Sequence, residues 1–133
     1  MTAGTLVLAA AAVMQFNLVC TGEQSHVLKI FGPREGVSQI QTTYRVDLAK
    51  NRFCKDSCDQ TQELAKVSET RIIFELEEAP NKDDWNDYIE FVNRENGDWR
   101  SRRRVSLGAE TSVFFVEGTC ARAPFTGLPS LKF

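Results

Sequence analysis

Hydrophobic and polar residues alternate along much of this chain, and this pattern predicts β-strands. The clearest stretch covers residues 40–48, where one face would carry Ile40, Thr42, Tyr44, Val46 and Leu48. Successive side chains of a strand point to opposite faces, so alternation with period two is typical of a strand with one buried face. Apolar or alternating runs over residues 16–20, 70–78 and 111–120 predict further strands.

The stretch from residue 83 to residue 107 fits two structures. One set of apolar residues falls at helical spacing: Trp85, Tyr88, Ile89 and Val92. The pair Asn96-Gly97, however, is a strong signal for a type I′ hairpin turn. We therefore predict a hairpin with strands over residues 88–94 and 99–107.

Two connections carry local signals of their own. Lys50 and Asn51 predict a tight turn, because Asn readily adopts a positive φ. Residues 59–68 predict one or two helical turns, since Asp59 is a suitable N-cap and Gln62 occupies the capping-box position.

These elements predict an all-β fold. The chain has 133 residues, no internal repeat, 42% hydrophobic residues and nine Phe, which suffice for the core of a single domain. About seven short, mainly antiparallel strands are typical of a small barrel or a barrel-like sandwich. We expect the first and last strands to be neighbours, so that the sheet curls and disulfides staple it.

The N-terminus resembles an export signal. An apolar run covers residues 5–14, with the small residues Ala10 and Ala12 in positions that signal peptidase reads, although the first four residues carry no Lys or Arg. The run is shorter than the ~20 residues of a membrane-spanning helix, so we expect no membrane insertion. We predict a signal peptide over residues 1–12, a single β domain over residues 13–133, and a periplasmic or secreted protein. The alternative is an N-terminal core strand or buried helix.

Export decides how the four cysteines are interpreted, because thiols pair in an oxidising compartment. Cys20 and Cys120 are in phase with apolar neighbours in the first and last strands. This favours the pairs Cys20 with Cys120 and Cys54 with Cys58 among the three connectivities that four cysteines allow. A zinc site is the first alternative, but the chain offers one His to complete it. A redox site is the second, but the spacing C-x3-C differs from the usual C-x2-C.

The sequence contains no recognisable catalytic constellation. Its one histidine, His26, is expected in a surface loop, and no Gly-rich phosphate loop is present. An acidic cluster could hold a carboxylate pair or Ca²⁺, but we interpret it as a solvated rim: Glu75, Glu77, Glu78, Asp83, Asp84, Asp87 and Glu90. We therefore predict no catalytic residues, no cofactor and no metal, and a protein that is not an enzyme. The net charge of −2 also argues against nucleic acid as a partner.

One basic cluster, in the stretch WRSRRRV, is the candidate anion-binding site. On a strand, Arg100, Arg102 and Arg104 would share one face, while the other would carry Trp99, Ser101, Arg103 and Val105. Three arginines along one face of a strand can hold the carboxylates of an envelope polymer through bidentate hydrogen bonds. The alternative is that they protect an edge strand and balance the acidic segment nearby.

Five stretches follow one another from the N-terminal strand to the C-terminus: FNLVCTG, YRVDLAKNRFC, VNRENG, GTC and PFTGLP. In this order the chain resembles a set of small exported bacterial proteins without an assigned activity. It has a looser likeness to the periplasmic inhibitors of c-type lysozyme, which are small β-barrels, and no site residue is carried over from them. Because the sequence offers no catalytic constellation, we expect a non-catalytic module that binds or interacts with an unknown protein or polymer of the cell envelope. The alternatives are an inhibitor of a periplasmic enzyme and a structural envelope protein without a small ligand.

Overall fold

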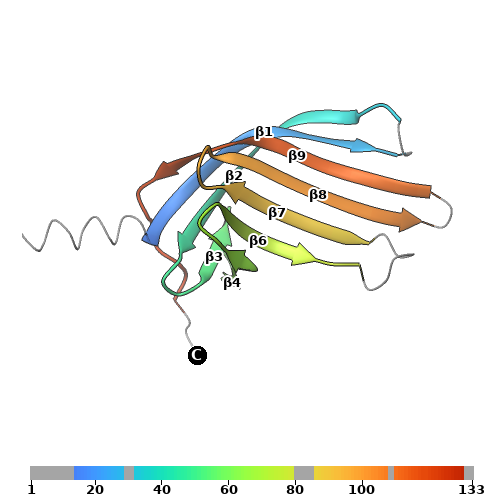
Figure 1. Cartoon of the computed structure of the whole chain (residues 1–133). Coiled ribbons are helices and arrows are strands. Elements are labelled where there is room, and N and C mark those ends of the chain that lie inside the picture. Colours follow the sequence, from blue (N-terminus) through green and yellow to red (C-terminus); the bar gives the residue numbers. More distant parts are fainter. Residues whose placement is uncertain (1–13, 29–31, 80–85, 108–109, 131–133) are drawn as a thin grey trace, which may run out of the picture.

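The computed structural model describes residues 14–28, 32–79, 86–107 and 110–130, so the predicted signal peptide lies outside the described residues. These residues form one antiparallel sheet, curled into a half-barrel, in the order β4-β3-β2-β1-β9-β8-β7-β6-β5 (Figure 1). The strands are β1 (Gln15–Val27), β2 (Glu35–Asp47), β3 (Arg52–Lys55), β4 (Gln62–Glu63), β5 (Lys66–Val67), β6 (Arg71–Glu77), β7 (Asp87–Asn93), β8 (Asp98–Leu107) and β9 (Glu110–Ala123). The all-β class is confirmed, with nine strands instead of about seven.

The additional strands lie where we predicted helical turns, and that prediction is wrong. Residues 62–67 form β4 and β5, and Leu64 between them is buried. The backbone N–H of Leu64 donates to the carbonyl of Asn51 at 3.0 Å, and that of Ala65 donates to Ile73 at 3.0 Å. Because the turn before β3 and strand β6 take these donors, the capping signal of Asp59 does not lead to a helix.

This connection closes one end of the half-barrel. β4 and β5 are the two edge strands of the sheet, and the short link at Leu64 joins them. Of β2, only residues 44–47 pair with β3, and of β6, only residues 72–73 pair with β5. The bridged end is the narrow end. At the opposite, wide end the first half of β2 has no outer strand partner among the described residues, so the concave face is open there.

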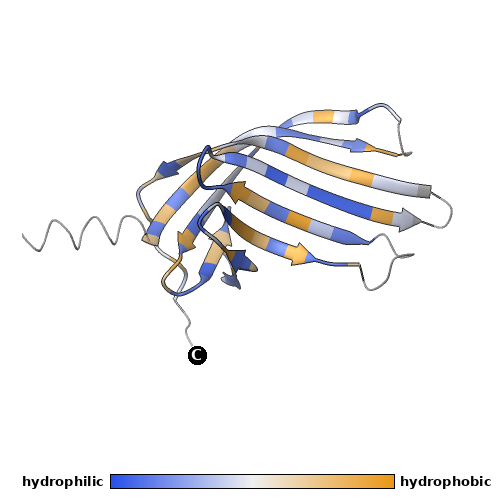
Figure 2. Ribbon diagram, viewed as in Figure 1, coloured by the Kyte–Doolittle hydropathy of each residue, from blue (hydrophilic) through white to orange (hydrophobic). Residues whose placement is uncertain are grey.

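The hydrophobic core fills the concave face at the narrow end. Tyr44 and Phe74 stack with ring centroids 3.9 Å apart, and Trp99 meets Tyr44 edge-on at 6.3 Å. Burial of an aromatic side chain stabilises a fold by roughly 1.5–3 kcal/mol. Along the strands, apolar and hydrophilic residues alternate (Figure 2). The core consists of Phe16, Leu18, Cys20, Tyr44, Val46, Phe53, Leu64, Ile72, Phe74, Val92 and Trp99.

The first and last long strands, β1 and β9, pair in the middle of the sheet. Cys20 lies directly opposite Cys120 in this ladder, and the two form a disulfide. Gly22 lies opposite Gly118, and a Cβ at Gly22 would come within 2.3 Å of the carbonyl oxygen of Glu117. Only glycine permits so close an approach of two backbones.

Both disulfides are those that the sequence favours. The second joins Cys54, at the end of β3, to Cys58 in the following turn, where Asp56 and Cys58 have a positive φ of 54°. No free cysteine occurs among the described residues, so these thiols form neither a zinc site nor a free dithiol. Two disulfides are compatible with an oxidising compartment.

The predicted hairpin is confirmed in β7 and β8, but its turn is longer than expected. The connection comprises residues 94–97, and only Gly97 has a positive φ, of 79°. The side-chain oxygen of Asn93 accepts a hydrogen bond from the N–H of Glu95 at 2.8 Å, and that of Asn96 accepts one from Asp98 at 2.9 Å. These local bonds favour the wider turn over a two-residue type I′ turn.

Candidate functional site

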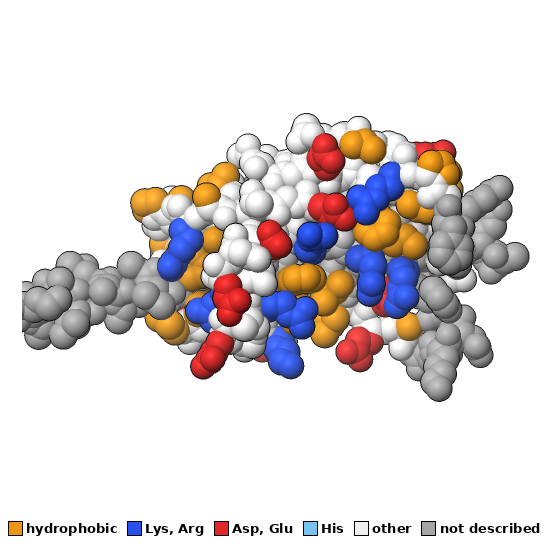
Figure 3. Space-filling model, turned by 45° about the horizontal axis from the view of Figure 1, so that its top comes forward, with side chains coloured by type: hydrophobic (Ala, Val, Ile, Leu, Met, Phe, Trp, Pro, Cys, Tyr) orange, Lys and Arg blue, Asp and Glu red, His pale blue; other side chains and the backbone are white. Residues whose placement is uncertain are grey.

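The predicted arginine stripe lies on the convex face of the half-barrel. Trp99 is buried on the concave face, so Arg100 and Arg102 of β8, which have the opposite parity, point outward. The surrounding side chains form what we call the convex patch, where basic and hydrophobic side chains interleave (Figure 3). Its members line a groove of about 470 Å³: Arg71, Ile89, Phe91, Arg100, Arg102, Phe115 and Glu117.

The three arginines of the stripe differ in their partners. Arg104 donates from Nε to both carboxylate oxygens of Asp87, at 3.0 and 2.9 Å. This hydrogen bonding lowers the pKa of Asp87. Arg100 Nη1 lies 3.6 Å from Glu117 Oε1, and both side chains are well exposed. Arg102 forms no ion pair with another described residue, so its guanidinium is the one most available to an incoming anion.

Aromatic rings lie between these charges. The guanidinium of Arg71 lies 5.1 Å from the centroid of the Phe91 ring, and that of Arg34 lies 4.9 Å from the centroid of Phe115. Arg34 also donates to Glu117 at 3.0 Å, which lowers the pKa of that carboxyl. The patch therefore offers flat apolar surfaces beside hydrogen-bond donors of fixed positive charge.

The outward position of Ile89 and Phe91 reverses the usual placement of apolar residues in a strand. Val92 and Glu90 of β7 are buried on the concave face, and Phe91 lies opposite Arg100 on the convex one. The cross-strand partner explains this orientation, because an inward Phe91 would carry the arginines of β8 into the core. Alternation in β7 alone could not indicate which of its faces is buried.

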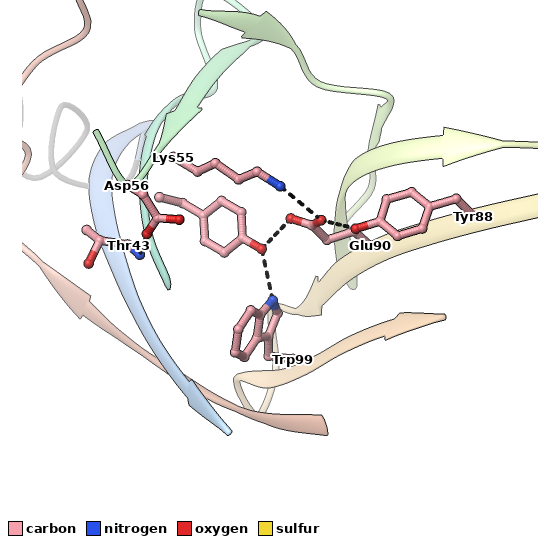
Figure 4. Close-up of polar contacts among 7 residues, drawn as sticks. Thr43, Lys55, Asp56, Tyr88, Glu90 and Trp99 are labelled. Carbon is pink, nitrogen blue, oxygen red and sulfur yellow. Dashed lines mark hydrogen bonds and ion pairs between the residues drawn. The ribbon is translucent and has the colours of Figure 1, made fainter. Parts of the chain in front are cut away.

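The concave face holds a polar network that the sequence did not predict (Figure 4). The Glu90 side chain is 5% exposed and accepts hydrogen bonds from the hydroxyls of Tyr44 and Tyr88. Lys55 Nζ lies 3.4 Å from Glu90 Oε1, and Trp99 Nε1 donates to the Tyr44 hydroxyl oxygen at 2.9 Å. Every buried polar atom of the network has a partner, as buried polar groups require.

This network keeps both phenols protonated. Burial raises the pKa of Tyr44, and the neighbouring Glu90 charge raises it further. The pKa of Tyr88 is raised for the same two reasons, in the same order. Both hydroxyls therefore act as hydrogen-bond donors to Glu90 at neutral pH, and the network cross-links β2, β3, β7 and β8.

Other candidate residues lie apart from one another. The acidic cluster does not form one solvated rim: Glu90 is buried, Asp87 and Glu77 pair with arginines, and Asp83 and Asp84 lie outside the described residues. Within the described part of the chain, no three His, Cys, Asp or Glu side chains are placed to hold a metal ion. His26 belongs to β1 and is half-buried, so its expected position in a surface loop is wrong.

No helix among the described residues is long and apolar enough to cross a membrane. Comparison of the chain with protein-family models, curated proteins and solved structures finds no significant match.

Proposed function

We propose that this protein is an exported, non-catalytic module that binds a polyanionic polymer of the cell envelope through the convex patch. The observation that carries the proposal is the interleaving of arginines with Phe91 and Phe115 along one groove. Guanidinium groups form bidentate hydrogen bonds with carboxylates, and aromatic faces pack against the apolar faces of sugar rings. An acidic polysaccharide presents both groups along its length.

The distribution of charge supports this choice. The whole chain has a net charge of −2, yet arginines outnumber carboxylates on the described convex face of β7–β9 and at its margins. A local excess of one sign attracts a polymer of the other sign even when the net charge does not. The charged residues concerned are Arg34, Arg71, Arg100, Arg102 and Arg104 against Glu23, Asp87, Asp98 and Glu117.

The proposed location is the periplasm or the extracellular space. The N-terminal apolar run supports export, and the two disulfides are compatible with an oxidising compartment. A role without catalysis is supported by the state of the titratable groups described above. Glu90 is occupied by two phenols and Lys55, and neither phenol is ionised to act as a base.

Binding to polygalacturonate, a carboxylated polysaccharide, tests the proposal, with neutral dextran as the control polymer. Affinity should fall as NaCl concentration rises, because salt screens exposed charges. Arg102→Gln should weaken binding about fivefold, the effect of ~1 kcal/mol for an exposed charge pair. Arg103→Gln is the matched control, since this neighbour on β8 points to the concave face and should leave affinity unchanged.

Two results would contradict this function. Equal binding of dextran and polygalacturonate would show that charge does not select the polymer. Equal affinities of the wild type and Arg102→Gln for polygalacturonate would show that the stripe does not bind the polymer. Its arginines would then only protect the sheet surface and pair with Asp87 and Glu117.

A further inference from the structure

The concave face contains a second cavity, at the wide end, which shares Ser101, Phe115 and Val116 of the intervening sheet with the convex groove. Its volume is about 330 Å³, within the range of small-molecule sites. The cavity adjoins the Glu90 network, because Tyr88 lines the cavity and its hydroxyl donates to Glu90. The side chains that characterise it are Gln24, His26, Ser101, Arg103, Phe114 and Val116.

Arg103 supplies the positive charge of this cavity. Its guanidinium lies 4.2 Å from the centroid of the Tyr88 ring, which orients it. Its ion pair with Glu77 spans 3.6 Å between two exposed side chains, and such pairs contribute little to stability. Arg103 can therefore exchange Glu77 for an oxyanion of a ligand. Ser101, two residues earlier on the same face of β8, provides a hydroxyl beside it.

The side of the cavity formed by β9 and the end of β1 carries the aromatic and apolar groups. Phe114 of β9 is 44% exposed although it lies on the concave face, and it pairs across the sheet with Arg103. The ring of His26 lies 5.8 Å from that of Phe114, and Val116 continues the wall toward the core. An exposed aromatic ring inside a concave site, next to a cation, is suited to a ligand with one apolar part and one anionic group.

We propose that this cavity binds a small amphipathic anion. The oxyanion of the ligand, a carboxylate or sulfonate, lies at Arg103 and Ser101, and its aromatic or aliphatic body packs against Phe114 and Val116. The two sites use different cations, because Arg102 and Arg103 project from opposite faces of the same strand. Failure of polysaccharide binding would therefore leave this proposal intact.

Two fluorescent probes that share an aromatic body test it: 8-anilinonaphthalene-1-sulfonate and uncharged N-phenyl-1-naphthylamine. The wild type should bind the sulfonate about tenfold more tightly, as a charge-assisted hydrogen bond of ~1.4 kcal/mol implies. Arg103→Gln should remove this preference and leave the affinity for the uncharged probe within about twofold. Lys66→Gln, which removes an exposed cation of β5 outside both sites, is the control and should change neither affinity. Phe114→Ala should weaken the binding of both probes.

Amide shifts in nuclear magnetic resonance spectra locate the bound probe. Addition of the sulfonate should shift the amides of Gln24, Gly36 and Phe114, which line only this cavity, and leave those of Arg71 and Phe91, which line only the convex groove, unchanged. Equal affinity of the wild type for both probes would overturn the proposal. An Arg103→Gln protein that melts like the wild type and keeps the preference for the sulfonate would also overturn it, as would shifts confined to the convex patch.

Discussion

Glu90 shows how the environment of a single residue departs from what its charge suggests. Carboxylates are rarely buried unless their oxygens have partners. Here the hydroxyls of Tyr44 and Tyr88 and the ammonium of Lys55 supply those partners. The free-energy cost of burying the carboxylate is offset by hydrogen bonds that connect three strands. Removal of any partner would leave a buried polar group unsatisfied, which costs about 1–3 kcal/mol.

At this scale we predict that both tyrosines resist ionisation. Tyr44 and Tyr88 are the only tyrosines of the chain, so tyrosinate absorbance reports on these two residues alone. Their pKa values are raised in the folded state, whereas the phenols of the unfolded chain ionise near pH ~10. The folded state then holds more protons than the unfolded state above that pH. The network's contribution to the free energy of unfolding is therefore complete below pH ~10 and is lost as the pH rises further.

An ultraviolet pH titration of the native protein checks this. Tyrosinate absorbance should rise only as the protein unfolds, while the chain in urea should titrate near pH ~10. Glu90→Gln is the control, because removal of the charge should lower both pKa values while the phenols stay in place. Ionisation of either tyrosine near pH ~10 in protein that retains its native circular dichroism would contradict the prediction.

At the scale of elements, the β7–β8 hairpin is positioned by its own turn and by the strand beside it. The N–H of Gly97 donates to the carbonyl of Asn93 at 2.8 Å. The carbonyl of Gly97 accepts a hydrogen bond from the N–H of Cys120 at 2.8 Å. The turn is thus attached to β9 next to the long disulfide. A Cβ at Gly97 would lie 2.8 Å from the carbonyl oxygen of Cys120, and the φ of 79° is unfavourable for other residues.

We predict that Gly97→Ala destabilises the protein more than Gly127→Ala. Both glycines have a positive φ, so each substitution introduces backbone strain of roughly 1–2 kcal/mol. A Cβ at Gly127 meets no atom within 4 Å, whereas one at Gly97 meets the backbone of β9. The difference in the free energy of unfolding, measured in urea, should be about 1 kcal/mol or more. Equal losses of unfolding free energy in the two variants would contradict the prediction, because they would show that β9 accommodates the Cβ at Gly97 without further destabilisation.

At the scale of the whole molecule, the half-barrel depends on contacts between distant parts of the chain. β1 and β9 lie next to each other in the centre of the sheet, and the edge strands β4 and β5 are consecutive in sequence. The Cys20–Cys120 disulfide spans 100 residues at the central pair, while Cys54–Cys58 spans four. The first constrains the unfolded chain far more than the second.

We predict that loss of the long disulfide costs more stability than loss of the short one. The loop-entropy relation gives about 4.7 kcal/mol for the long loop and about 2 kcal/mol for the short one. Cys20 and Cys54 are both fully buried, so the packing losses are similar and the difference should be about 2–3 kcal/mol. Urea unfolding of Cys20→Ala/Cys120→Ala against Cys54→Ala/Cys58→Ala measures it. Equal stabilities, or a larger loss from the short bridge, would contradict the prediction.

The alternation of side chains was enough to predict most strands, because period-two patterning is a property of neighbouring residues. Asn51 has the positive φ expected of its turn, at 56°. The cysteine pairing was favoured by phase, since Cys20 and Cys120 alternate with apolar neighbours in their strands. The same alternation placed Arg100 and Arg102 on the face opposite Trp99, as the structure shows.

Only the tertiary structure decided which face of β7 is buried and that residues 62–67 form strands. β7 carries apolar residues on both faces, and the choice depends on β8, because Arg100 and Arg102, opposite Phe91 and Ile89, cannot enter the core. The backbone N–H groups of Leu64 and Ala65 find their acceptors at Asn51 and Ile73, outside the segment 59–68, so a local capping signal is overridden. Both cavities also join residues of several strands. Their existence depends on the curl of the sheet, because pairings across the whole chain determine which side chains meet.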